Sequence, residues 1–212
     1  MSVYLPTHFT APDRAAAARL VHDHPFATLV TPAPDGPLIS HVPLLLMSSS
    51  EPNGMLLGHM ARANPHWRQA GSVESVAIFH GPHAYVSPSW FADPANGVPT
   101  WNYAVVHATG TLEVLDDPLD ARRVLDALAT RFEATRDAPW QFAMSERQRD
   151  ALVGAIVAFR MPVRLLTGKF KLSQNRTRDD QRRIADALDT EPYADATAVA
   201  AWMRRYGAAT RE

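Results

Sequence analysis

The 212-residue sequence contains no cysteine, which excludes disulfide bonds, thiolate metal ligands and cysteine nucleophiles. No apolar run approaches the ~20 residues that span a membrane. The first residues lack the basic start and long apolar stretch of a signal peptide. We therefore expect a cytoplasmic protein without a membrane partner. The formal net charge of −1 gives the chain as a whole no general attraction to nucleic acid.

Several motifs of cofactor and catalytic chemistry are also missing. Neither GxGxxG after a strand nor GxxxxGK[ST] occurs, so the sequence predicts neither a dinucleotide fold nor a P-loop. No serine stands in GxSxG, and Ser89 has no assigned base, so no hydrolase triad is predicted and the catalytic residues stay unknown. The nine histidines form no i, i+4 pair beside a carboxylate, and we expect no metal site.

Short apolar strands between proline-rich turns dominate the first half of the chain. Segment 26–31 (FATLVT) is β-branched and aromatic, and segment 38–47 is its hairpin partner, in which Pro43 marks an edge or a bulge. Strands joined by short turns, without a regular alternation with helices, favour an antiparallel barrel. Further strands are predicted at 55–59, 73–80, 83–87, 103–110 and 157–165.

Capping signals indicate where the helices begin. Thr10, Ser145 and Thr177 are each followed after three residues by a carboxylate or an amide, the spacing of a capping box. Asp117 precedes a proline and starts the most regular apolar period of the chain, a second common helix start. A last helix is predicted over residues 195–206.

Residues 81–110 contain an unusual aromatic loop. Trp90 and Phe91 lie between Pro88 and Pro99, and Trp101 follows two residues after Pro99; prolines fix φ and remove amide donors. Large aromatic side chains in a stiff loop must bury against the protein's own core, a second subunit or a flat ligand. The sequence leaves these three possibilities open.

Two segments carry groups suited to a phosphate or a heterocycle. Arg62 and Asn64 follow a predicted strand at the start of a short helix, where amide groups and a cation can hold a phosphate. Alternation places Lys169, Lys171 and Ser173 on one side of an extended segment. A solvated surface is the competing interpretation for both segments. A basic cluster near residues 176–183 is interrupted by two aspartates, which argues against a nucleic-acid interface.

Seven motifs resemble, in their order, the FMN-binding negative transcriptional regulators of the PaiB type. They are YLPTHF, HPFATLVT, ISHVPLLL, GHMARANPHW, FHGPHAYVSPSWF, VPTWNYAVVHATG and GKFKLSQNR. The resemblance covers roughly residues 4–188, and its specific motifs are VSPSW, PTWNY and GKFKLSQNR. Phe91 departs from the pattern, since relatives often carry tyrosine after the tryptophan of SPSW.

The resemblance implies a pyridoxamine-phosphate-oxidase-like fold: mainly β with peripheral helices, a six-stranded antiparallel Greek-key split β-barrel of the FMN-binding type. It further implies a homodimer with FMN at the subunit interface. We expect residues 1–188 to form the FMN-binding split-barrel domain and residues 189–212 a C-terminal helical appendage. The implied function is negative transcriptional regulation, with direct DNA binding left open. The alternative is an FMN-dependent oxidoreductase, a flavin reductase or oxidase-like enzyme without a direct DNA-binding role.

The resemblance also implies which residues contact FMN. A strand would run beside the ring, a strand-to-helix junction would receive the phosphate, and two later motifs would close the site. The expected cofactor-binding residues are Ser40, His41, Val42, His59, Arg62, Asn64, Trp90, Trp101, Asn102, Tyr103, Lys169, Lys171, Ser173, Gln174 and Asn175.

Overall fold

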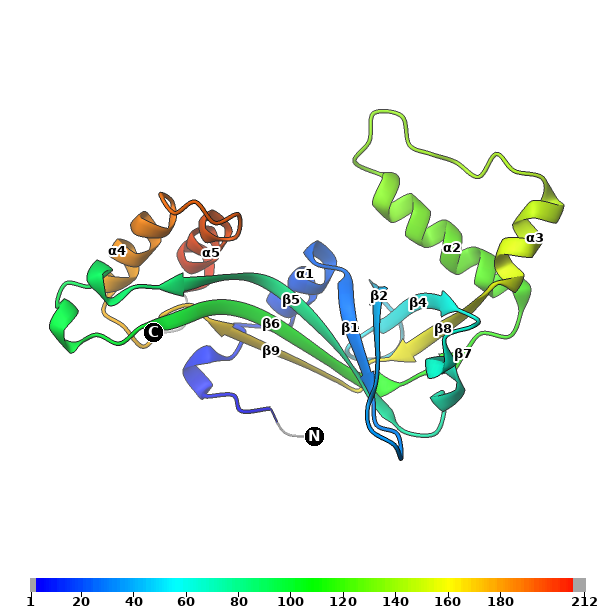
Figure 1. The fold of residues 1–212 in the computed structure, drawn as a ribbon, viewed down its shortest axis with the longest axis horizontal. Helices are drawn as coiled ribbons and strands as arrows, with labels where there is room; N and C mark the ends of the chain where they lie inside the picture. The colour runs from blue at the N-terminus through cyan, green and yellow to red at the C-terminus, as the bar shows by residue number, and fades with distance from the viewer. Residues whose placement is uncertain (1–2, 208–212) are drawn as a thin grey trace. The chain divides into compact units, whose positions relative to one another are not determined.

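The computed structural model describes residues 3–207, which divide into two compact units. Within the described residues, the first unit comprises residues 3–24, 80–106 and 167–207, and the second comprises residues 25–79 and 107–166. The mainly β architecture with peripheral helices is confirmed (Figure 1). Within residues 3–207 there are nine strands in two sheets rather than six strands in one barrel, and the strand order is β2-β1-β5-β6-β9 and β3-β4-β8-β7.

The second unit contains most of the short strands and two α-helices. Two long strands, β5 and β6, each contribute one part to this unit and the other part to the first unit. Its elements are β1 (Phe26–Thr31), β2 (Leu38–Pro43), β3 (Leu45–Met47), β4 (Met55–Ala61), the 3-10 helix η2 (Pro65–Gln69), the start of β5 (Glu74–Val86), the end of β6 (Thr100–Thr111), β7 (Glu113–Val114), α2 (Pro118–Glu133), α3 (Glu146–Gly154) and β8 (Ile156–Pro162).

The first unit packs helices with the other parts of the two long strands. Strands β5, β6 and β9 are neighbours in the sheet, as Figure 1 shows. The elements are η1 (Thr7–Phe9), α1 (Arg14–Asp23), the end of β5, η3 (Pro88–Trp90), η4 (Pro94–Asn96), the start of β6, β9 (Leu165–Lys171), α4 (Arg178–Leu188), α5 (Ala196–Trp202) and the π-helical turn η5 (Met203–Gly207). The predicted division at residue 188 stays a prediction.

Pro43 divides what the sequence predicts as one strand. Strand β2 pairs with β1 in register from Phe26 opposite Pro43, and the next residue, Leu44, is buried and donates its amide to the carbonyl of Pro25 at 2.9 Å. Strand β3 then pairs with β4, so the chain changes sheets at this point. Proline lacks the amide that would continue the ladder, which explains the break.

Two further predictions of boundaries are corrected. The segments 73–80 and 83–87 form the single strand β5, because Gly81 and Pro82 continue in extended conformation. A Cβ at Gly81 would lie 3.0 Å from the Leu20 side chain, so glycine at this position permits close packing of α1. The first helix is capped by Asp13, whose carboxylate accepts the amide of Ala16 at 2.7 Å, and not by Thr10, which bridges to Lys169.

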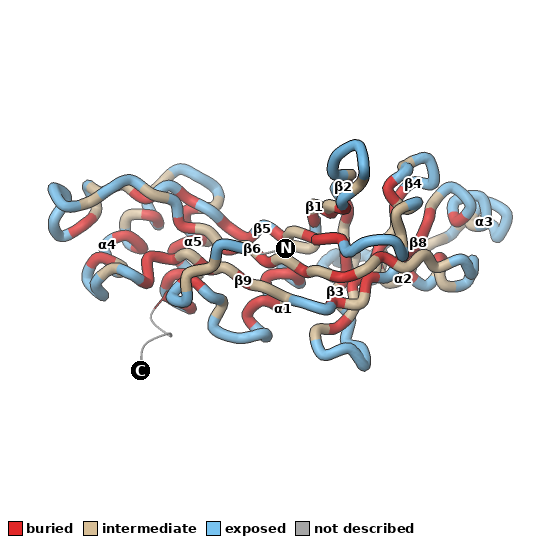
Figure 2. Tube along the Cα trace, turned by 90° about the horizontal axis from the view of Figure 1, so that it is seen from below, coloured by how far each residue is buried: buried red, intermediate tan, exposed pale blue. Residues whose placement is uncertain are grey.

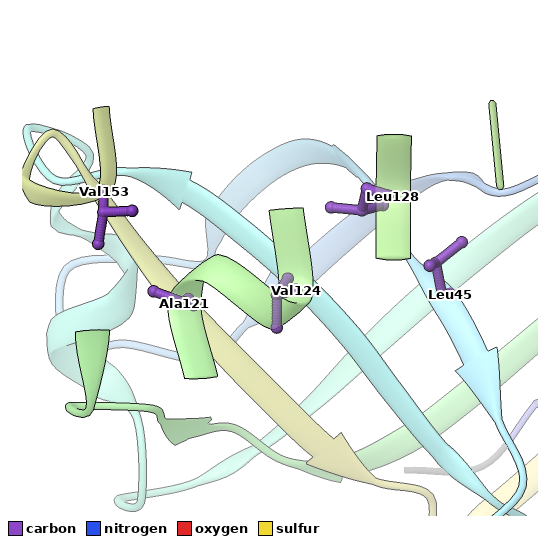
Figure 3. Close-up of a cluster of buried hydrophobic side chains, with 6 residues drawn as sticks. Leu45, Ala121, Val124, Leu128 and Val153 are labelled. Atoms are coloured by element: carbon purple, nitrogen blue, oxygen red, sulfur yellow. The ribbon is translucent and has the colours of Figure 1, made fainter. Parts of the chain in front are cut away.

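Alternating burial along the strands and helices builds the cores. Figure 2 shows buried residues recurring along the strands and exposed residues gathered in the turns. In the second unit, one face of α2 contacts the four-stranded sheet and α3, as the close-up in Figure 3 shows. This cluster, termed the α2 core, consists of Leu45, Ala121, Val124, Leu128, Val153 and Ala158.

Truncation of Leu128 to alanine should lower the free energy of unfolding by about 2–4 kcal/mol, because it leaves a cavity in the α2 core. Leu119 lies on the same helix but is exposed, so Leu119→Ala is the matched control. Urea denaturation of both variants checks the prediction. Equal losses for the two leucines would show that α2 does not pack through this face.

Candidate functional site

The expected site residues fall into two groups, one in each unit. Each group is built from neighbouring strands or strand ends and is described by itself. The group of the second unit is Ser40, His41, Val42, His59, Arg62 and Asn64, and the group of the first unit is Trp90, Trp101, Asn102, Tyr103, Lys169, Lys171, Ser173, Gln174 and Asn175.

A buried hydrogen-bonded chain organises the second unit's group around a histidine that the sequence analysis did not select. The imidazole of His66, only 1% exposed, lies with Nδ1 2.8 Å from Ser40 Oγ and Nε2 2.7 Å from Thr31 Oγ1. Asn64 Nδ2 donates to Ser40 Oγ at 2.9 Å, and Thr31 Oγ1 lies 2.5 Å from Ser75 Oγ. We term these five residues the His66 chain. They join β1, β2 and β5 to the turn before η2.

Burial lowers the pKa of His66, because the charged imidazolium would lose its hydration. The two ring nitrogens contact hydroxyl groups, which can pair with a neutral ring. The imidazole of His66 is therefore held neutral near pH 7.

His59 lies on β4, half-buried, and its Nδ1 is a buried nitrogen without a hydrogen-bond partner within residues 3–207. Burial also lowers the pKa of this histidine. A buried polar atom without a partner costs about 1–3 kcal/mol, and such atoms are rare in folded proteins. A polar group of a ligand would satisfy it.

Arg62 connects the end of β4 to the start of β8. Its guanidinium donates from Nε to the carbonyl of Gly154 and from Nη2 to the carbonyl of Ile156, both at 2.7 Å. Its backbone amide donates to the carbonyl of Ala155 at 2.9 Å. These bonds occupy two of the five N–H groups of the guanidinium, and the other three, which have no partner among the residues that the structure describes, could contact an anion. No local signal in the sequence indicates this structural role of Arg62, because its carbonyl partners lie more than 90 residues away along the chain.

The three expected residues of β2 do not face the same way. Ser40 and Val42 are buried, whereas His41 is on the exposed face of the strand, where its Nδ1 lies 3.2 Å from Thr28 Oγ1. Alternation along a strand separates neighbouring side chains in this manner. The strand therefore cannot present Ser40 and His41 to one side of a ligand.

The lysine pair is the clearest electrostatic feature of the first unit. Lys169 and Lys171, the two lysines of the chain, lie on one face of β9. Lys171 Nζ donates to Thr100 Oγ1 at 2.5 Å and to the carbonyl of Trp101 at 2.6 Å, and Lys169 Nζ donates to the carbonyl of Tyr4 at 3.0 Å. Burial, and secondarily the charge of Lys169, lower the pKa of Lys171. Within the described residues neither lysine has a carboxylate partner.

A buried polar cluster shapes the turn after β9. Ser173 has a positive φ of 66°. Its Oγ donates to Oδ1 of the fully buried Asn102 at 3.1 Å and accepts from Nδ2 of the same residue at 2.9 Å. Gln174 is also buried and folds back, accepting the amide of Leu172 at 2.7 Å and donating to the carbonyl of Phe170 at 2.5 Å. These amides are occupied by the chain itself, whereas Asn175 is exposed. Their observed role is to fix the turn that follows the lysines.

The aromatic loop divides between core and surface. Phe91 is buried beneath the guanidinium of Arg176, which lies 4.0 Å from the ring centroid, and the neighbouring amide of Ala92 donates to Asp180 at 2.8 Å. Trp90 is half-buried. Trp101 is 52% exposed and contacts the edge of Tyr85, with ring centroids 6.2 Å apart.

The lysine pair also lies against aromatic rings. Tyr103 is half-buried, and its ring centroid lies 5.6 Å from Lys169 Nζ. The face of β9 thus combines cations with aromatic surface, which suits an anionic aromatic ligand.

Two features are absent from the described residues. No group of three or more histidine, cysteine, aspartate or glutamate side chains among residues 3–207 is arranged to hold a metal ion. In the same part of the chain, no helix is both long and apolar enough to cross a bilayer.

The family model described as "Putative FMN-binding domain" matches residues 3–165 of this chain. "Protease synthase and sporulation protein PAI 2" from Bacillus subtilis is 31% identical over 204 residues, covering 95% of this chain and 96% of that protein.

Two solved structures share the fold. The FAD and heme binding protein from Mycobacterium smegmatis has a TM-score of 0.59 at 18% identity, covering 77% of this chain and 73% of that one. The flavocytochrome Anf3 from Azotobacter vinelandii has a TM-score of 0.59 at 11% identity, covering 80% of this chain and 70% of that one. At these identities the likeness concerns the fold alone.

The neutral state of His66 predicts a pH-dependent stability. In the unfolded chain this histidine gains a proton near pH 6.5, whereas in the folded chain its lowered pKa delays protonation. The free energy of unfolding should therefore be constant above about pH 7.5 and fall as the pH drops below about 6.5, by at most about 1.4 kcal/mol per pH unit for this group.

Urea denaturation of wild type and His66→Asn between pH 5 and 8 checks this dependence. The free energy of unfolding of His66→Asn should depend less steeply on pH than that of wild type. His59, whose pKa is also lowered, should contribute to the dependence that remains. A His66→Asn slope equal to that of wild type would contradict the prediction.

Proposed function

Because this chain belongs to the FMN-binding domain family whose model it matches, we propose that it acts as an FMN-binding negative transcriptional regulator of the PaiB type. The resemblance expected from the sequence motifs is confirmed, and FMN is the cofactor that the family's description names. The observation that carries the regulatory proposal is the near full-length match to the Bacillus subtilis protein named for protease synthesis and sporulation.

Features of each unit fit FMN. In the first unit, the lysine pair, which has no carboxylate partner among residues 3–207, suits the phosphate, and the exposed face of Trp101 suits a ring. In the second unit, the unpartnered Nδ1 of His59 and the remaining N–H groups of Arg62 suit polar atoms of the cofactor. When bound, FMN supplies redox chemistry, and the protein's part is to bind, orient and tune it.

The finer architecture belongs to the same proposal. We infer an FMN-binding split-barrel domain over residues 1–188, a helical appendage over residues 189–212 and a cytoplasmic homodimer with FMN at the subunit interface. The exposed apolar side chains of the first unit support the dimer, since Tyr85, Val98 and Trp101 would be covered by a second copy.

Lys171→Gln should weaken FMN binding by about tenfold or more, the lower range for hydrogen bonds to a charged group. Riboflavin lacks the phosphate and should lose much less. Fluorescence titration with both flavins measures the two dissociation constants. Equal losses for FMN and riboflavin would place this lysine at the ring instead of the phosphate, and unchanged binding of both would remove it from the site.

Light scattering at micromolar concentration should give twice the chain mass of 23.4 kDa for the wild type. Trp101→Glu places a charge on the proposed interface and should shift the protein to monomer. Trp140, which is also 52% exposed but lies in the second unit, provides the matched control Trp140→Glu. A wild-type monomer, or a dimer that tolerates Trp101→Glu, would contradict the proposed interface.

Regulation should not require tight DNA binding by the isolated protein. Arg182 and Arg183 both pair with Asp179, at 2.6 and 2.7 Å, which reduces the positive charge that α4 offers to phosphates. We expect no nanomolar shift of the gene's own upstream DNA at physiological salt. A sequence-specific nanomolar shift would contradict this expectation.

Transcript levels test the regulatory function itself. In cells that lack the gene, repressed transcripts should rise, and complementation with wild type should restore repression whereas Lys171→Gln should not. Unchanged transcripts would overturn the proposal. Steady-state oxidation of NADH or NADPH by the purified flavoprotein would instead support the oxidoreductase alternative.

A further inference from the structure

We propose that His66 is a positioning residue of the FMN site: its backbone amide fixes the orientation of the Asn64 amide and its neutral imidazole fixes the direction of the Ser40 hydroxyl, so that Asn64 presents one N–H donor to an acceptor oxygen of the ligand. This inference rests on the proposed function, since it assumes that Asn64 faces FMN. It assigns a role to a residue outside the set expected from the sequence.

The orientation of the Asn64 amide follows from its two partners. Oδ1 accepts the backbone amide of His66 at 3.0 Å, and a backbone N–H can only donate. Nδ2 is therefore the atom that donates to Ser40 Oγ at 2.9 Å. Both ends of the amide are fixed, and one N–H of Nδ2 has no partner in the described part of the chain.

The tautomer of His66 follows from Ser40. The Ser40 oxygen already accepts a hydrogen from Asn64, and its own hydroxyl hydrogen has one partner within the described residues, His66 Nδ1 at 2.8 Å. If Nδ1 carried a hydrogen, the buried Ser40 hydroxyl would be left without an acceptor, which is costly.

The hydrogen bonds on the Nε2 side of the His66 chain are consistent with this tautomer. With Nδ1 as an acceptor, Nε2 carries the hydrogen of the neutral ring and donates to Thr31 Oγ1 at 2.7 Å. Thr31 can then donate to Ser75 Oγ at 2.5 Å. Each side chain therefore donates to the next, from Asn64 through Ser40, His66 and Thr31 to Ser75. The last two residues lie on strands β1 and β5.

The consequence for a ligand is a defined polarity. Ser40 has no hydrogen left to donate, and Asn64, which is half-exposed, has one. Asn64 therefore recognises an acceptor, either a phosphate oxygen or a carbonyl of the flavin ring. His66 itself is buried and acts through these two residues without touching the ligand.

Two substitutions at His66 distinguish the hydrogen bond of Nδ1 with Ser40 from that of Nε2 with Thr31. The amide of His66→Asn places an acceptor near the position of Nδ1, opposite Ser40, whereas the amide of His66→Gln reaches the position of Nε2, opposite Thr31. We expect His66→Asn to bind FMN within about twofold of wild type and His66→Gln to bind about tenfold more weakly, the scale of one hydrogen bond. Equal affinities for the two variants, or the reverse order, would overturn the proposal.

Riboflavin distinguishes the two acceptor oxygens in the same titrations. A loss confined to FMN assigns the Asn64 donor to the phosphate, and a loss shared by riboflavin assigns it to the ring. Melting temperatures of both variants show whether each remains folded at the titration temperature.

The wild-type protein provides a test that needs no folded variant. Long-range 1H–15N spectra report the tautomer of His66, with its signals assigned by their absence from His66→Asn or by sequential assignment. We expect an unprotonated Nδ1 and a protonated Nε2 at pH 7.5, and a hydrogen on Nδ1 would overturn the inference. Failure of the wild-type chain to bind FMN would overturn the proposed function and this inference together, whereas wild-type binding with unchanged variants would overturn the inference alone.

Discussion

The pairing of buried polar groups is the constraint on which both units depend. A buried hydroxyl, amide or imidazole without a partner costs about 1–3 kcal/mol, a large part of the net stability of a domain. The second unit meets this constraint with the His66 chain, and the first unit meets it with Asn102 and Ser173. Because each partner must lie at hydrogen-bonding distance, these clusters hold their strands and turns in one arrangement.

Local chemistry explains which features of the fold could be predicted from the sequence. The strand at residues 26–31 and the helices capped by Asp117 and Ser145 depend on residues close together in the chain, and the structure has them as predicted. The break at Pro43 and the continuity of β5 through Gly81 depend on partners elsewhere in the fold. The count of six strands came from the family resemblance, whereas residues 3–207 contain nine; the sheet exchange at Pro43, which adds one of them, is not visible in a local pattern.

The candidate site shows the same division between local and distant information. Motifs located the segments that carry polar groups, but they could not say which atoms were already occupied. The Arg62 guanidinium bonds carbonyls 92 and 94 residues away, and the amide of Gln174 is used within its own turn. His66 was missed because a histidine after Asn-Pro has no distinguishing local signal; its partner Ser40 lies 26 residues earlier.

The lysine pair also makes the chain unusual toward amine chemistry. In carbamylation, glycation and acylation a neutral amine is the nucleophile, and Lys169 and Lys171 carry the only side-chain amines in the sequence. Partial burial lowers the pKa of Lys171 and so enlarges its neutral, nucleophilic fraction. Covalent modification of side-chain amines in this protein is therefore confined to one face of β9. An anion bound to that face would also shield the two lysines from modification.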